Sequence, residues 1–405
     1  TAGSVLFGAF VFESWEMMIL VLNAGAIAAE WGLDTRQTGS LIGSLFLGMI
    51  PGALLWGRLS GSLGRRTCAV ASLALYAPIP LLSAFAPSFE VLWWLRFAGG
   101  VALAGALVVT FPYFEELVPA RLRGRATVYL SAGWPVGLLV AVGVTAALAD
   151  AGWRAVIGLS SVSLLWAVAI HRLVPESPYW LATRGRHAEA ATVIGRLSRG
   201  RISASTLPPP AGTGRSEPFA ALFRGPVLRL TLLQMVVNFC FAWGYWALAT
   251  WMPALLAQRG LSAPEGLGFI AVSALFMFPG YLAASYLTGR FGRKRTMTAF
   301  VLVAAIAGFA FAGSATRGEM YFWNFTLSFF SLGAWGVWNT WLAEIYDTRL
   351  RGMGVAWGVT MQRVANALAP VAIGATLESS SFLRTVSLIS AFLGCTFVAA
   401  LFLPE

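Results

Sequence analysis

The sequence predicts an all-α membrane protein whose twelve spanning helices form two pseudo-symmetric six-helix bundles. Composition is the first reason, because 58% of the 405 residues are hydrophobic and 11% are charged, against about 25% charged in a typical soluble domain. An internal repeat is the second reason. The loop pattern G-x-x-G-R at 61–65 recurs at 289–293, and E-x-x-x-x-R-x-R-G at 116–124 recurs at 344–352 with the same offset. Two homologous halves are therefore expected.

Each predicted span is a stretch of mainly apolar residues that reaches the length of about 20 needed to cross a bilayer. In chain order these stretches are 4–29, 38–60, 66–86, 90–116, 124–149, 153–174, 226–258, 265–289, 294–314, 319–345, 352–377 and 382–403. The first stretch is too long for the hydrophobic region of a cleavable signal peptide. Six spans each are assigned to an N-terminal bundle over 1–174 and a C-terminal bundle over 226–405.

The loops between the spans predict the orientation. Arg and Lys concentrate in the loops after even-numbered spans, whereas the other loops are short and nearly charge-balanced. By the positive-inside rule, both termini are expected on the cytoplasmic side of a bacterial inner membrane. These basic loops account for the net charge of +11, so no nucleic-acid partner is expected. Anionic membrane lipids are the expected contacts of the basic loops, and a monomer is expected.

The long polar stretch 175–225 is expected to link the bundles on the cytoplasmic side. Its first part, 178–199, alternates apolar and Arg residues in the pattern of an amphipathic helix that lies on the inner membrane surface. Its second part is rich in Pro, Gly and Ser, which is typical of a flexible linker.

Catalytic and cofactor motifs are missing from the sequence. Three Cys are scattered in apolar segments and two His lie at the inner boundary, so neither a disulfide framework nor a metal site is expected. The sequence contains no G-x-x-x-x-G-K-[ST] loop and no Gly-rich dinucleotide fingerprint. An ATP-driven pump or another enzyme is not expected, and no cofactor is predicted.

The loop motifs resemble those of the major facilitator superfamily. The family pattern G-x-L-x-D-x-x-G-R-R matches 57–66, with Gly61 in place of the Asp, and E-x-x-P-x-x-x-R-G matches 116–124. The segment PESPYWL at 175–181 resembles one shared by sugar porters and by organic-ion and synaptic-vesicle-protein-like transporters, and 333–354 is most similar to the organic-ion branch. The resemblance implies secondary transport by alternating access, with a mid-depth site between spans 1, 4, 7 and 10.

Arg and Glu residues at the inner helix ends form a predicted cytoplasmic gate. An Arg beside a Glu that is partly out of water makes charge-assisted hydrogen bonds, and one cluster per half would face the other across the gate. The gate residues are Arg65, Glu116 and Arg123 in the first half, and Arg293, Glu344 and Arg351 in the second. In the alternative reading, these Arg residues only set topology and bind anionic lipid.

Two acids in the first span are the strongest functional signal. Glu13 and Glu16 lie three residues apart on one helix face, and Glu16 is near mid-span, where a charge costs about several kcal/mol. Burial favours the protonated form of an acid, so Glu16, with Glu13 as second choice, is predicted to carry a coupled proton. The acids could instead bind a cationic substrate, or be held permanently by a neighbouring helix. They resemble the F-D-G-Y-D motif of the organic-ion branch, with Glu at both Asp positions.

Two Arg residues lie within predicted spans. Arg363 in span 11 is opposite in sign to Glu16 and in the other half. It could dock an anionic substrate, exchange as the ion-pair partner of a span-1 Glu, or pair within its own half. Arg96, with Gly100 four residues later, resembles the R-x-x-x-G motif of span 4, for which the family implies a role in proton coupling or helix packing.

Polar and aromatic residues of spans 7 and 10 complete the predicted binding site. Aromatic walls suit a flat or cationic ligand, although such residues can also simply pack or face lipid. The selected residues are Gln234, Asn238, Trp246, Trp335 and Asn339.

These residues together predict a secondary transporter of a small organic ion. The first choice is an aromatic or short monocarboxylate moved with a proton, with Arg363 as the anion contact. An organic cation held by Glu13 and Glu16 is the second choice. A sugar–proton symporter is the third, because Gln234 stands alone where sugar porters have a glutamine pair. A non-transporting membrane sensor with the same fold is the remaining alternative.

Overall fold

The computed structural model describes residues 2–119, 129–198, 200, 219–347, 350–377 and 379–404, and the regular structure of these residues is helical. The first half contains α1 (Ala2–Trp31), α2 (Thr35–Leu63), α3 (Arg65–Tyr76), α4 (Pro78–Ala84), α5 (Phe89–Leu117), α7 (Gly133–Ala147), α8 (Gly152–Gly158) and α9 (Ser163–Leu173), with short 3-10 turns η2 (Ala149–Ala151) and η3 (Leu159–Val162). The connecting segment contains α10 (Pro178–Thr183), α11 (His187–Leu197) and η5 (Phe219–Phe223). The second half contains α12 (Gly225–Gln258), α13 (Ala263–Phe291), α14 (Arg293–Gly313), α15 (Arg317–Ile345), α16 (Arg351–Leu377) and α17 (Phe382–Leu401).

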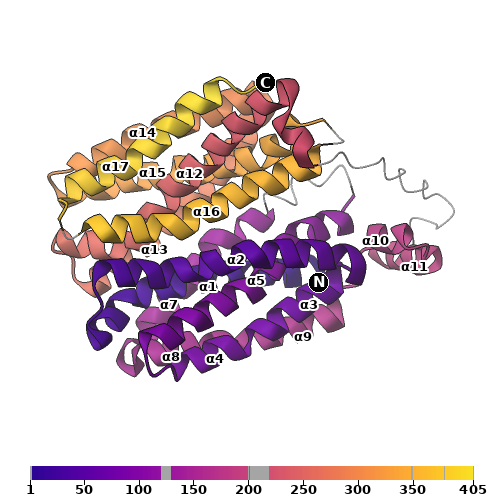
Figure 1. Ribbon diagram of the computed structural model, residues 1–405, viewed down its shortest axis with the longest axis horizontal. Coiled ribbons are helices and arrows are strands. Elements are labelled where there is room, and N and C mark those ends of the chain that lie inside the picture. Colours follow the sequence, from indigo (N-terminus) through magenta and orange to yellow (C-terminus); the bar gives the residue numbers. More distant parts are fainter. Residues whose placement is uncertain are drawn as a thin grey trace.

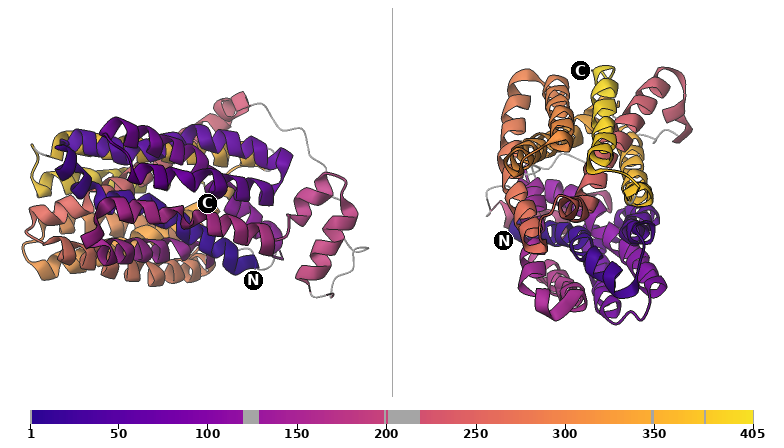
Figure 2. Two further views of the ribbon diagram at one scale, coloured as in Figure 1. Left: turned by 90° about the horizontal axis from the view of Figure 1, so that it is seen from below. Right: turned by 90° about the vertical axis from the view of Figure 1, so that its left-hand side faces the viewer.

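Two bundles of long helices lie side by side (Figures 1 and 2), as the sequence predicts. Helices α1–α5 and α7–α9 form one bundle and α12–α17 form the other, while α10 and α11 lie beyond one end of the helices. We call this end the linker end and the opposite one the far end. The domain limits at 174 and 225 stay a prediction.

Within the described ranges, the helices form twelve units of spanning length where twelve apolar stretches were predicted. Among the described residues, ten helices or helix pairs are long and apolar enough to cross a membrane. The other two units, α15 and α16, have 29 and 27 residues but contain more polar side chains, several of which face other helices in the protein interior. Pro78 divides the third unit into α3 and α4, because proline has no N–H and cannot continue the helical hydrogen bonds.

The repeated glycines explain the turns at the linker end. Gly64 joins α2 to α3 with a φ of 102°, and Gly292 joins α13 to α14 with a φ of 84°. Glycine adopts this conformation without the steric cost that a Cβ would add. The second Gly of each G-x-x-G-R loop is therefore the residue that reverses the chain between two spans.

The connecting segment differs from the single amphipathic helix predicted over 178–199. Gly185 has a φ of 75° and separates α10 from α11. Trp180 and Leu181 of α10 pack with Ala190 of α11, so part of the apolar face predicted to contact the membrane is used between these two helices.

The bundles touch most closely along α2 and α16 in the far half of the molecule. A Cβ at Gly39 would overlap the carbonyl oxygen of Pro370, and one at Gly374 would overlap that of Thr35. The Thr35 hydroxyl donates to the Gly374 carbonyl oxygen over 2.5 Å. Small residues thus allow two helices from different bundles to approach closely.

Candidate functional site

Four buried charges lie in the membrane-spanning helices. Among the described residues, Glu13, Glu16, Arg96 and Arg363 are the charged side chains that are buried, with 1%, 0%, 0% and 9% exposure. Two acids and two guanidiniums cancel in formal charge. Because each isolated charge is costly in this environment, their pairing decides what the site can do.

Glu16 is paired inside the first bundle. Its carboxylate accepts a hydrogen bond from the Tyr76 hydroxyl of α3 and lies 3.9 Å from the Arg96 guanidinium of α5. Arg96 also donates to the Glu16 carbonyl oxygen over 3.4 Å. These partners belong to one bundle, so they need not separate when the two bundles move.

Glu13 and Arg363 are arranged differently. Neither carboxylate oxygen of Glu13 has a hydrogen-bond partner among the described residues. Arg363, on α16 of the other bundle, interacts electrostatically with Glu13, but among the described residues the two side chains do not form a direct ion pair. The attraction between these two charges therefore crosses the interface between the bundles, while Glu16 and Arg96 balance each other within one bundle.

A buried amide network surrounds Asn238 on α12. The Asn238 amide nitrogen donates to the Gln234 side-chain oxygen over 2.7 Å. Its oxygen accepts from the Trp338 indole over 2.9 Å and from the Gln362 amide over 2.6 Å. The Gln234 amide nitrogen has no partner among the described residues. Because Gln362 directly precedes Arg363 on α16, the network helps to fix the position of that helix.

Aromatic side chains join the bundles at mid-depth. The Trp134 indole of α7 donates to the Tyr245 hydroxyl of α12 over 2.8 Å, and the Trp134 and Trp246 rings meet edge to face with centroids 5.4 Å apart. The Asn366 amide is oriented so that its nitrogen donates to the Gln362 carbonyl oxygen over 2.9 Å. Its oxygen then accepts from the Trp246 indole over 3.1 Å. The Ser14 hydroxyl, beside Glu13 on α1, donates to the Trp134 carbonyl oxygen over 2.6 Å.

The polar and aromatic residues selected from the sequence divide into two groups. Gln234, Asn238 and Trp246 belong to the buried network described above, and Trp335 lies near it, with its ring centroid 6.3 Å from that of Tyr245. Asn339 is exposed and makes no hydrogen bond with another described side chain, so the structure does not bring it to this cluster.

Several site residues were not predicted. Tyr76 bonds the predicted Glu16, Trp338 bonds the predicted Asn238, and Trp134 and Tyr245 bond each other across the interface between the bundles. Asn366 follows Gln362 by one helical turn, and that spacing could have indicated a polar stripe on span 11. The aromatic residues gave no comparable signal, because aromatic side chains are frequent throughout the spans.

The predicted gate residues pair within their own bundles. Arg65 of α3 lies 3.2 Å from Glu116 of α5, and Arg293 of α14 lies 2.5 Å from Glu344 of α15. Arg123 lies outside the described residues, and the side chain of Arg351 is exposed. The ion pairs found among the described residues do not join one bundle to the other, and the facing of the two clusters across the gate stays a prediction.

The segment that resembles the PESPRWL motif caps α3. The Glu176 carboxylate accepts from the backbone N–H groups of Arg65 and Arg66 over 2.9 and 3.0 Å, and the Trp180 indole donates to the Gly61 carbonyl oxygen over 2.9 Å. Gly61, which replaces the family's Asp, therefore contributes its backbone to the docking of α10.

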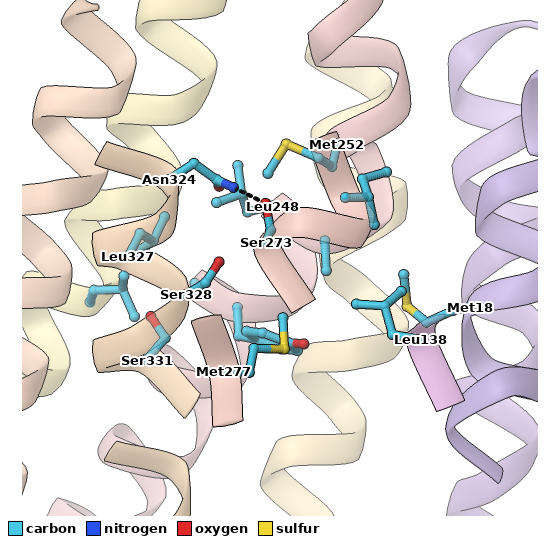
Figure 3. A pocket seen from close by; sticks show the side chains of 15 residues that line it. Met18, Leu138, Leu248, Met252, Ser273, Met277, Asn324, Leu327, Ser328 and Ser331 are labelled. Atoms are coloured by element: carbon cyan, nitrogen blue, oxygen red, sulfur yellow. Dashed lines mark hydrogen bonds between the residues drawn. The ribbon is translucent and has the colours of Figure 1, made fainter. Parts of the chain in front are cut away.

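An uncharged cavity of about 70 Å³ lies beside the aromatic residues. Figure 3 shows Ser328 and Ser331 on one wall, with Met18 and Leu138 of the first bundle on the opposite side. Tyr245 also contributes to the lining. None of the four buried charges lines this cavity, so it is separate from the charged site.

Comparison with known proteins agrees with this architecture. Residues 5–370 match the family model described as Major Facilitator Superfamily. The niacin transporter NiaP of Acinetobacter baylyi is 30% identical over 90% of this chain and 84% of its own length, and the synaptic vesicle 2-related protein of Bos taurus is 26% identical over 99% and 77%. The xylose transporter XylE from E. coli, solved in a partially occluded inward-open conformation, superposes with a TM-score of 0.80 at 19% identity. The match covers 100% of this chain and 99% of that one, which shows a shared fold. The chain therefore belongs to the major facilitator superfamily and is a multi-pass membrane transporter of a small molecule, with no enzymatic role.

Proposed function

We propose that the chain moves a small aromatic monocarboxylate together with one proton across a bacterial inner membrane, by alternating access. The observation that carries the proposal is the Glu13–Arg363 arrangement, in which a buried acid without hydrogen-bond partners interacts electrostatically with a buried guanidinium on the other bundle. The relative named as a niacin transporter supports the substrate class, since niacin is an aromatic monocarboxylate.

Charge balance links the anion to the proton. Before substrate binds, the Glu13 carboxylate balances Arg363. A substrate carboxylate that pairs with Arg363 replaces Glu13 as its counter-ion and makes charge-assisted hydrogen bonds with the guanidinium. Glu13 would then be a buried anion without a counter-charge, a state that is strongly disfavoured, so it takes up a proton. One proton accompanies one monovalent anion, and the loaded site stays neutral.

The same balance assigns different roles to the two acids. Glu16 keeps its partners Tyr76 and Arg96 inside one bundle, so substrate does not displace them, and Arg96 serves to hold Glu16. Glu13 is therefore the proton site that responds to substrate. An organic cation fits less well, because each buried acid already has a guanidinium beside it and a bound cation would add an unbalanced positive charge.

The contacts between bundles support the direction in which the site opens. Within the described residues, the two hydrogen bonds that join the bundles, Thr35 to Gly374 and Trp134 to Tyr245, lie at the far end and at mid-depth. We place the linker end in the cytoplasm together with both termini, since basic loops favour the inner side. The structure then corresponds to a state that is closed to the outside, and rocking of the bundles over 1–174 and 226–405 about the mid-depth site would open the far end.

Binding of nicotinate to the detergent-solubilised protein tests the anion site. In isothermal titration calorimetry, Arg363→Gln should weaken nicotinate binding by at least about thirtyfold, because removing one partner of a buried charged hydrogen bond costs roughly 2–5 kcal/mol. Arg384→Gln, which changes an exposed Arg at the start of α17, is the matched control and should bind like wild type. Unchanged affinity in Arg363→Gln would exclude Arg363 as the anion contact.

A further inference from the structure

The cavity beside Tyr245 lies apart from the charged site along the transport axis. Met18 lines it and follows Glu13 by five residues on α1, which corresponds to about 7.5 Å toward the far end. On the second bundle the lining comes mainly from the far half of α12 and α13 and from α15. Trp134 and Tyr245, which bond to each other, lie near both sites.

One wall of the cavity is polar. Asn324, Ser328 and Ser331 lie on one face of α15 and are 2%, 9% and 4% exposed. The Asn324 amide donates to the Ser273 hydroxyl of α13 over 2.6 Å, as Figure 3 shows. The hydroxyls of Ser328 and Ser331 have no hydrogen-bond partner in the part of the chain that the structure describes. Neither hydroxyl is among the fully enclosed atoms without a partner, and both residues line the cavity, so a ligand that enters the cavity could form hydrogen bonds with these hydroxyls.

The remaining walls are apolar and adaptable. Met18, Met252 and Met277 contribute thioether side chains, and Leu138 and Leu248 add aliphatic ones. Methionine has several rotatable bonds and favours contact with aromatic rings. A cavity of about 150 Å³ holds benzene, whereas this one has about 70 Å³, so a single ring would enter as the Met side chains shift.

The lining also excludes charged ligands. No side chain that lines the cavity is charged, and a carboxylate or ammonium placed there would lose its hydration without gaining a counter-ion. We propose that this cavity is a second ligand site, for an uncharged planar ring whose edge carries hydrogen-bonding groups, such as an aromatic carboxamide. The Ser328 and Ser331 hydroxyls bind the polar edge, since a hydroxyl both donates and accepts, and the Met side chains cover the ring faces.

Nicotinamide is the probe for this site, and nicotinate is the probe for the charged site. Binding of each to the full chain in detergent is measured by isothermal titration calorimetry. The double variant Ser328→Ala/Ser331→Ala should weaken nicotinamide binding at least tenfold and leave nicotinate binding within about twofold of wild type, because two neutral hydrogen bonds are lost in one site only. Ala249→Leu, which adds bulk to the same cavity, should have the same selective effect. Ser44→Ala, a buried Ser on α2 whose hydroxyl bonds the Leu41 carbonyl oxygen, is the matched control.

The charged-site variant completes the comparison. Arg363→Gln should lose nicotinate and keep nicotinamide. The second site would be overturned if wild type failed to bind nicotinamide. It would also be overturned if Arg363→Gln lost nicotinamide binding while the double serine variant bound nicotinamide normally. Absence of nicotinate binding in wild type would overturn the proposed function alone, because the nicotinamide measurements do not depend on it.

Discussion

Replacing Glu13 by Gln should separate anion movement from proton movement. Glutamine keeps the size and polarity of the side chain but cannot take up the proton. If one proton accompanies one anion, a pH difference of one unit is worth about 1.4 kcal/mol, and the wild type should concentrate the anion about tenfold. In Glu13→Gln the same gradient should drive no accumulation, while exchange of labelled for unlabelled anion at equal pH continues, since Arg363 is intact.

The assay uses proteoliposomes with labelled nicotinate, an inward proton gradient, and potassium with valinomycin to hold the membrane potential at zero. Because the loaded site is neutral, imposing a potential should not change wild-type accumulation. Glu90→Gln, at an exposed acid at the start of α5, is the matched control and should accumulate like wild type. Gradient-driven accumulation by Glu13→Gln at the wild-type level would refute Glu13 as the substrate-linked proton site.

The same substitution has a stability consequence. Glu13→Gln leaves the buried Arg363 without the acid that balances its charge. Breaking a buried ion pair costs about 3–5 kcal/mol, and the loss here should be smaller, because the two side chains are not in direct contact. Nicotinate should restore much of this loss, because its carboxylate supplies the missing charge. Thermal melting with and without nicotinate should therefore show a larger stabilisation by ligand in the variant than in wild type, and an equal shift in both proteins would contradict the charge-balance reasoning.

Three further substitutions test other contacts. Gly39→Leu should abolish uptake but keep nicotinate binding. A side chain at this position overlaps the carbonyl oxygen of Pro370 and prevents closure of the far end, so normal uptake would show that the close approach of the two helices is dispensable. Glu176→Ala should cost about 1–2 kcal/mol in thermal unfolding, because the start of α3 loses its cap, and amide exchange should rise there first. Tyr76→Phe removes the hydroxyl that bonds Glu16 and should destabilise by about 1–3 kcal/mol without changing the ratio of protons to anions; a changed ratio would assign the coupled proton to Glu16.

The sequence repeat was enough to predict the two bundles and the Arg–Glu pairs at the linker end. These residues lie at helix ends on the same side of the predicted membrane, which is where the loop pattern places them. Arg65 with Glu116, and Arg293 with Glu344, pair as expected within each half.

The sequence cannot predict which side chains pair with the mid-span charges, and the reason is physical. Spanning helices are apolar on most sides, so hydrophobic periodicity does not fix their rotation or depth. The partners of Glu16, Tyr76 on α3 and Arg96 on α5, depend on both quantities. The sequence therefore identifies Glu13 and Glu16 as functional candidates and favours Glu16 as the proton site, whereas our proposal assigns the substrate-linked proton to Glu13.

The number of protons taken up for each nicotinate bound tests the central claim most directly. Calorimetric titrations in two buffers of different ionisation enthalpy give this number for the solubilised protein. We expect close to one proton per nicotinate in wild type and in Glu16→Gln, and none in Glu13→Gln. Binding without proton uptake in wild type, or unchanged uptake in Glu13→Gln, would contradict the exchange of Glu13 for substrate at Arg363.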